Sequence, residues 1–157
     1  MMVGTRKAFE DFTIGDSIVF HRVTVSKEDI IDFAAAWDPQ PMHLDEDAGR
    51  ASILGNLTGS GWHMICILMR GMCDGFLIES TSQGSPGIDD VRWLKPLHPG
   101  DDLTLRYTVL EARVSKSRPS IGIVKFRFEM MNQNDVMLMV LENPIMFGRR
   151  QDAEAHG

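Results

Sequence analysis

Long hydrophobic runs are missing from this sequence of 157 residues. The longest apolar stretch, Trp62–Met69, is followed at once by Arg70. It falls far short of the roughly 20 residues that a membrane-spanning helix needs. The first seven residues have no apolar run behind their basic side chains, which a secretory signal requires. We therefore expect a cytoplasmic protein that does not cross a membrane.

Cysteine is scarce, with only Cys66 and Cys73 in the chain. Both fall in one expected helix, where a rise of about 1.5 Å per residue places their backbones roughly 10 Å apart, too far for a disulfide. We expect two buried thiols in a reducing compartment. His63 and Cys66, with Asp45 elsewhere, form a weak metal pattern, because zinc sites show more ligands at recognisable spacing. Core packing is the better interpretation, and no metal is predicted.

Positive charge is in short supply, with 16 lysines and arginines against 22 acidic residues and a net charge of -6. This balance argues against broad nucleic-acid binding, which requires a basic surface to neutralise phosphates. The net charge still allows a local basic patch that binds a phosphorylated cofactor. The chain length suits one globular domain, which we place at residues 1–148, with a flexible polar tail over 149–157.

The first half of the chain combines a strand pattern with helix patterns. Residues 17–25 alternate imperfectly, as in a strand. Ser26 opens a capping-box-like helix start over 27–37, in which Ile30, Phe33, Ala34 and Trp37 share one buried face. Pro39 disfavours helical geometry at the preceding residue, so 38–43 is expected to be a stiff non-helical loop. A short helix over 45–51 and a longer one over 61–78, apolar on nearly every side, follow.

The second half of the chain has strand patterns. Apolar and polar residues alternate over 103–109 and 124–130, and residues 136–146 form a further strand that Pro144 interrupts. A helix that is apolar all round must be wrapped, and these antiparallel strands are the available wrapping. The sequence therefore predicts an α+β domain. Its sheet closes poorly as a monomer, which favours edge pairing into a dimer.

Asp38 and His43 form the strongest candidate for chemistry, because proline-rich backbone joins them. A carboxylate and an imidazole held rigidly can grip one water molecule and transfer protons to and from it. As a bare pattern, the pair has a structural alternative, in which Asp38 caps the following turn and His43 bonds a backbone carbonyl.

Residues 58–63, Thr-Gly-Ser-Gly-Trp-His, precede the apolar helix. Small residues let a ligand approach the backbone, and free amides at a helix start can hold a developing negative charge. The structural alternative is an ordinary helix start with Ser60 as N-cap. The two interpretations are compatible, because a capped helix start still offers a free amide.

These features resemble the MaoC-like dehydratase, or (R)-specific enoyl-CoA hydratase, family. Residues 38–45, Asp-Pro-Gln-Pro-Met-His-Leu-Asp, with Ala48, match the order and spacing of the family's hydratase motif. The helix start after them, the Pro-Leu-His-Pro-Gly-Asp turn at 96–101 and the closing strands follow the family's layout. The likeness covers nearly the whole chain.

The resemblance implies a hot-dog fold, a homodimer or dimer of dimers, and a coenzyme A thioester bound near the subunit interface. Asp38 and His43 match the pair that activates water, and Gly61 matches the glycine whose amide holds the thioester oxygen. The implied reaction is reversible hydration of a trans-2-enoyl-CoA, with no cofactor beyond the coenzyme A of the substrate. Gln40, Ser60 and Trp62 are expected to line the substrate site. Gln40 replaces the usual Asn and Ser60 the commoner His, and both departures bear on substrate choice.

Lys116 and Arg118 belong to a small basic loop that suits the phosphates of the cofactor, or is simply solvated. Two other functions fit the same fold. An acyl-CoA thioesterase would direct the activated water at the carbonyl carbon, and a non-catalytic subunit would bind acyl-CoA without turnover.

Overall fold

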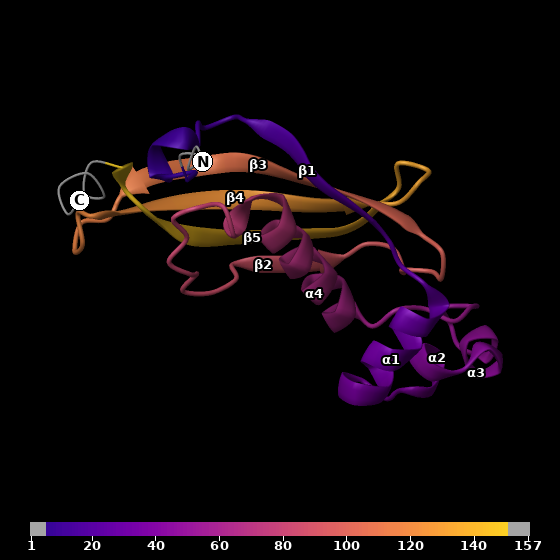
Figure 1. Ribbon diagram of the computed structural model, residues 1–157. Helices are drawn as coiled ribbons and strands as arrows, with labels where there is room; N and C mark the ends of the chain where they lie inside the picture. The colour runs from indigo at the N-terminus through magenta and orange to yellow at the C-terminus, as the bar shows by residue number, and fades with distance from the viewer. Residues whose placement is uncertain (1–5, 151–157) are drawn as a thin grey trace, which may run out of the picture.

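The computed structural model describes residues 6–150, and a five-stranded antiparallel sheet is its main element. The strand order is β1-β3-β4-β5-β2. The strands are β1 (Ser17–Thr24), β2 (Asp90–Trp93), β3 (Asp102–Val114), β4 (Ile121–Met131) and β5 (Met137–Gly148). Helix α4 (Gly61–Met72) lies across one face of this sheet (Figure 1). This is the α+β hot-dog arrangement that the sequence predicts.

The face of the sheet toward α4 carries the core, as the alternation predicted. Side chains at every second position of β3 and β4 are buried, because successive residues of a strand point to opposite faces. The buried rings pack edge-to-face and stacked around Phe126, whose ring lies 5.2 Å from those of Tyr107 and Phe128. Phe76, on the turn that follows α4, packs against Tyr107 and Phe126 at 5.2 and 5.9 Å, so the cluster joins this end of the helix to the sheet.

Helix α4 begins at the predicted residue and continues through a π-helical turn, Cys73–Leu77. Its inner face buries Met64, Leu68 and Met72. The sheet covers this inner face, as predicted, while Trp62 and Met69 on α4 are exposed in the single chain. Cys66 is also exposed, so the expectation of two buried thiols is wrong.

Three helices lie together at one end of the sheet (Figure 1). Helix α1 (Lys27–Trp37) has the predicted bounds and the predicted Ser26 cap, whose hydroxyl accepts from the Asp29 N–H at 3.0 Å. Helix α3 (Glu46–Ala51) is the expected short helix. Between them, the predicted non-helical loop contains a short helix, α2 (Pro41–Leu44). Proline at the first position of a helix loses no hydrogen bond, so Pro41 starts α2 rather than preventing it.

Strand β5 runs through Pro144 without the predicted interruption. The Glu142 carbonyl and the Met146 N–H both point toward residues 84–89, so Pro144 between them points the same way. Strand β2 begins at Asp90, which pairs with Glu142, so β2 does not extend opposite Pro144. The missing N–H of Pro144 therefore removes no bond between strands.

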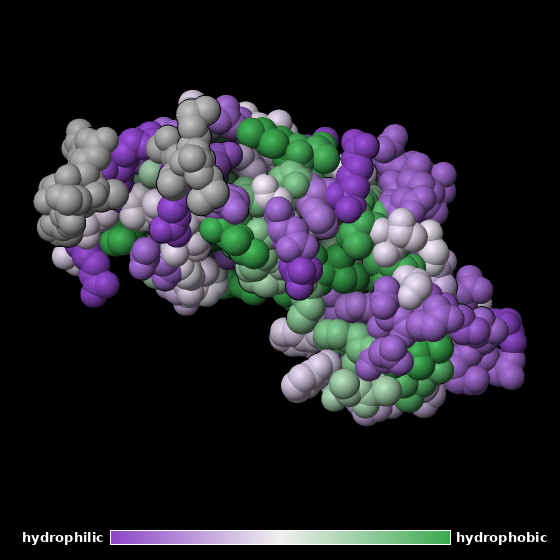
Figure 2. All heavy atoms as spheres, in the orientation of Figure 1, coloured by the Kyte–Doolittle hydropathy of each residue, from purple (hydrophilic) through white to green (hydrophobic). Residues whose placement is uncertain are grey.

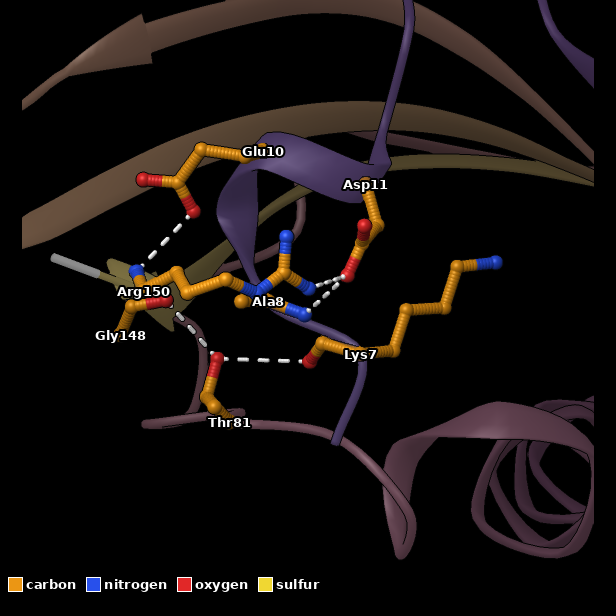
Figure 3. A network of polar contacts seen from close by, with 7 residues as sticks. All are labelled: Lys7, Ala8, Glu10, Asp11, Thr81, Gly148 and Arg150. Carbon is orange, nitrogen blue, oxygen red and sulfur yellow. Dashed lines mark hydrogen bonds and ion pairs between the residues drawn. The ribbon is translucent and has the colours of Figure 1, made fainter. Parts of the chain in front are cut away.

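The residues around Glu10 and Asp11 contact Arg149 and Arg150, and Figure 3 shows the contacts of Arg150. The Arg150 N–H donates to Glu10 Oε2 at 3.1 Å, and its guanidinium bonds Asp11. The Arg149 N–H donates to the Ser120 carbonyl at 3.0 Å. The predicted flexible tail therefore begins too early, because residues 149 and 150 are bonded to the domain. Its remainder, 151–157, lies outside the described residues.

Within residues 6–150, no helix is long and apolar enough to cross a membrane.

Candidate active site

Asp38 occupies the C-cap of α1, where its N–H donates to the Ala34 carbonyl at 2.8 Å. Pro39 keeps the chain from continuing the helix, so it leaves α1 at Asp38. The Asp38 side chain is 14% exposed, so it lies at the edge of solvent. The sequence therefore places a carboxylate at a rigid corner between two helices.

His43 lies on α2 and is buried. Its Nδ1 lies 2.6 Å from the Thr58 carbonyl oxygen. A carbonyl can only accept a hydrogen bond, so Nδ1 carries the hydrogen. In the neutral ring Nε2 is then the unprotonated nitrogen. The carbonyl contact that the structural alternative expected is thus present, and it fixes the tautomer that leaves Nε2 free to accept a proton.

Asp38 Oδ2 and His43 Nε2 face each other at 3.5 Å. The corner at Pro39 and the turn of α2 bring the two side chains together, as predicted from the sequence. An acceptor nitrogen beside a carboxylate makes no direct hydrogen bond while the ring is neutral. A water molecule placed between them could donate to both atoms, and an imidazolium would pair directly with the carboxylate.

Two donors bond the Asp38 carboxylate. The hydrogen bonds from the Ser60 hydroxyl and the Gln40 amide lower the pKa of Asp38 below its ordinary value of 3.8. Gln40 Nε2 lies 2.7 Å from Asp38 Oδ1. The structural alternative also expected Asp38 to cap the following turn, which is not observed, because Gln40 is the N-cap residue of α2.

Gly61 is the first residue of α4, after Ser60 as the predicted N-cap. The Ser60 hydroxyl accepts from the Trp62 N–H at 3.2 Å. The Gly61 N–H has no intrahelical acceptor, because the first amides of a helix have none. Its carbonyl accepts from Trp93 Nε1 at 3.0 Å. A Cβ at residue 61 would lie 2.7 Å from Trp93 Cε2, so the close approach of the indole requires glycine.

One cavity of about 610 Å³ joins these groups. Its lining includes Asp38, Gln40, His43, Gly61 and Trp62, which are five of the predicted site residues. Buried Ser60 reaches it through its bond to Asp38. In Figure 2, hydrophobic residues are visible on both sides of the step where the sheet meets the three helices.

The sequence did not reveal several of the cavity walls. Trp93 and the segment that follows it, through Pro96, form part of the lining. No local signal marks this wall, because it depends on the pairing of β2 with β5, a contact between distant parts of the chain. Trp37 also lines the cavity and is 78% exposed. Its predicted burial is wrong, because the last turn of α1 faces the cavity.

Lys116 and Arg118 do not reach this cavity within one chain. Their loop joins β3 to β4 at the end of the sheet opposite the three helices (Figure 1). Strand β3 has 13 residues. At about 3.3 Å per residue it separates the loop from the cavity by roughly 40 Å. The two residues are exposed, which agrees with the solvated loop that was the alternative.

His63 and Cys66, three residues apart on α4, differ in burial. The His63 ring is buried and stacks on Phe33 with centroids 4.4 Å apart, whereas Cys66 is exposed. Burial lowers the pKa of His63, and the charge of Asp29 opposes this shift. His63 is a core residue as expected, while packing of Cys66 in the core is not observed.

Comparison with known proteins agrees with this geometry. A model of the MaoC-like domain matches residues 10–126, which is more than half of the chain. The chain belongs to the MaoC-like domain family. The crystal structure of a MaoC-like dehydratase from Rhodospirillum rubrum is 35% identical with a TM-score of 0.80, and the match covers 91% of this chain and 97% of that one.

Two further proteins extend the comparison. YdeM of Bacillus subtilis, an uncharacterized protein, is 28% identical over 89% of this chain and 98% of its own length. The (R)-hydratase PhaJ1 from Pseudomonas aeruginosa is 19% identical with a TM-score of 0.74, over 92% of this chain and 88% of that one, and shows the same fold. Membership of the MaoC-like family supports hydratase or dehydratase chemistry in general.

Proposed function

We propose that the protein catalyses the reversible hydration of a trans-2-enoyl-CoA to a 3-hydroxyacyl-CoA. The observation that carries the proposal is the 3.5 Å approach of Asp38 Oδ2 to His43 Nε2 on the wall of a cavity that also contains Gly61. Water bound between the two side chains and a thioester oxygen at the Gly61 N–H would share this space.

The tautomer of His43 and the lowered pKa of Asp38 indicate which of the two side chains acts as the base. The free Nε2 takes a proton from the water, since Nδ1 is committed to the Thr58 carbonyl. Asp38 is the weaker base because its pKa is lowered. Its carboxylate positions the water and then stabilises the imidazolium.

The reaction adds one water molecule across the C2–C3 double bond. The hydroxyl oxygen bonds to C3, and the C2–C3 π electrons move toward the thioester carbonyl. The Gly61 N–H at the start of α4 holds the resulting negative oxygen. The imidazolium of His43 returns its proton to C2, which regenerates the neutral ring. The reverse sequence releases water.

The direct assay follows the absorbance of the enoyl thioester after purified protein is mixed with crotonyl-CoA and with a panel of longer and branched enoyl-CoAs. Loss of the enoyl absorbance with formation of the 3-hydroxyacyl product supports the proposal. Release of free coenzyme A thiol from an acyl-CoA would instead indicate the thioesterase, and binding without turnover would indicate the non-catalytic subunit.

We also propose that the working form is a homodimer, or a dimer of such dimers. Strand β2 is an edge of the sheet, and Trp93 on it is 47% exposed. Two structures of this fold are described as complexes, ChsH1–ChsH2 and HadBC, both from Mycobacterium tuberculosis. Light scattering coupled to gel filtration measures the mass, and a monomer across the working concentration range would contradict the proposal. A cytoplasmic location stays a prediction from the sequence.

A further inference from the structure

A second, apolar cavity lies between α1 and α4. Its volume is about 460 Å³, and its lining consists of Phe33, Trp37, Trp62 and Cys66. Trp37 and Trp62 also line the cavity that contains Asp38 and His43. The two spaces therefore adjoin at these indole rings. We call the second space the α1–α4 slot.

The tryptophans that border the slot are largely exposed in the single chain. Trp37 is 78% exposed and Trp62 is 65% exposed. Indole rings are among the largest apolar groups, and leaving two of them adjacent and exposed forgoes the burial that normally favours them. Such a surface beside a reactive centre is suited to an apolar ligand group.

A bound thioester has two arms, and the catalytic cavity and the slot offer a separate place for each. From the carbonyl, one arm leads to the phosphorylated coenzyme and the other to the acyl chain. The lining of the catalytic cavity includes Lys95, an exposed cation suited to the coenzyme arm. The neighbouring slot, between α1 and α4, has no charged lining residue. The apolar arm therefore belongs on the slot side.

We propose that the α1–α4 slot binds the acyl chain, and that the enzyme prefers medium-length enoyl-CoAs over crotonyl-CoA. The proposal rests on the proposed hydratase function. Each methylene group buried in the slot raises kcat/KM about fourfold. Because the slot is open on one side, the four additional methylene groups of trans-2-octenoyl-CoA are not fully buried. We therefore expect its kcat/KM to exceed that of crotonyl-CoA by about ten- to hundredfold.

Alkylation of Cys66 reports on occupancy of the slot without requiring turnover. Cys66 is exposed and lines the slot, whereas half-buried Cys73 lies outside the slot lining and serves as the internal reference. Peptide mass spectrometry follows the rate at which N-ethylmaleimide labels each thiol. Octanoyl-CoA is the probe, because it is saturated and cannot be hydrated. Acetyl-CoA is the matched control with the same carrier and no chain.

At about ten times its dissociation constant, octanoyl-CoA should slow labelling of Cys66 about tenfold and leave Cys73 unchanged. Acetyl-CoA should leave both rates unchanged. An unaltered Cys66 rate while calorimetry shows octanoyl-CoA bound would overturn the proposal. It would also be overturned if Cys66 resists labelling without ligand and becomes reactive on dilution, because a second copy would then cover the slot.

A volume substitution tests the same point by kinetics. Cys66→Phe fills the slot and should lower the ratio of kcat/KM for trans-2-octenoyl-CoA over crotonyl-CoA about tenfold. Met69→Phe adds the same ring at an exposed position of α4 outside the slot lining and should leave the ratio unchanged. An unchanged ratio in Cys66→Phe, with circular dichroism of a folded protein, contradicts the proposal. Wild-type protein that hydrates no enoyl-CoA contradicts the proposed function itself, which is a different result.

Discussion

Gln40 Nε2 donates a hydrogen bond of 2.7 Å to Asp38 Oδ1, while Oδ2 of the same carboxylate faces His43. The amide therefore fixes the rotation of the carboxylate and directs one oxygen at the imidazole. Gln40 stands where the family's motif usually has Asn. The longer side chain still supplies a polar partner for Asp38, so the departure at this position preserves a donor in the site.

Replacing Gln40 by Leu should lower kcat about tenfold, because the Asp38 carboxylate loses the bond that orients it and small misplacements are costly in rate. Steady-state kinetics on crotonyl-CoA measures the effect. Gln83→Leu is the matched control, since Gln83 is an exposed glutamine whose side chain bonds the Thr81 carbonyl. Equal kcat in the two variants would exclude an orienting role for Gln40.

Replacing Ser60 by Ala should raise the pKa of Asp38 toward 3.8, because the Ser60 hydroxyl is the main donor that lowers it. A lowered pKa adds stability that is present above the unfolded-state value and is lost as the pH falls through the folded-state value. The contribution of Asp38 to the difference in stability between wild type and variant is therefore fully present above about pH 4 and disappears as the pH falls below that value. Carboxyl-carbon NMR titration of Asp38 is the measurement, and an unchanged midpoint would refute the assignment. Loss of the N-cap should also cost about 1 kcal/mol of stability.

Substituting Gly61 by Ala should lower kcat about a hundredfold, because the new methyl group meets Trp93 and moves the amide that receives the enolate oxygen. Adding Trp93→Ala should restore part of the rate by making room. Gly87→Ala is the control, since a Cβ there has no atom within 4 Å. Full activity of Gly61→Ala would show that the amide at residue 61 has no role.

Local signals were sufficient for the elements that carry the site. Ser26 marks the start of α1 and Pro39 its end, and Ser60 caps α4. The alternation of apolar and polar residues marks β3 and β4. These elements could therefore be predicted from neighbouring residues. The start of α2 at Pro41 had a readable signal in proline at the first helical position, but the restriction that Pro39 and Pro41 place on their preceding residues favoured a loop.

Other features depend on contacts between distant segments and were therefore missed. Strand β2 is four residues long and is defined by its pairing with β5. Trp93 reaches Gly61 as a consequence. Trp37 and Cys66 are exposed because no other part of the described chain packs over them. Helical periodicity shows which residues share a face, but it does not show whether another segment covers that face.

The aromatic core provides a prediction for stability. Phe126 is fully buried, and its ring neighbours include Phe12, Tyr107 and Phe128. Phe126→Ala should reduce the free energy of unfolding by about 3–5 kcal/mol, through lost burial and a residual cavity. Urea denaturation measures the change. Ile78→Ala, at a site that is 66% exposed, should change it by less than about 1 kcal/mol. Similar losses in both variants would contradict the assignment of the core.

The most direct test of the central claim is the rate of crotonyl-CoA hydration by wild type, Asp38→Asn and His43→Gln. If the two side chains hold and deprotonate one water, wild type consumes the enoyl absorbance, and each variant loses about a hundredfold or more in kcat while its circular dichroism is unchanged. Wild-type rates in both folded variants would show that the water is activated elsewhere.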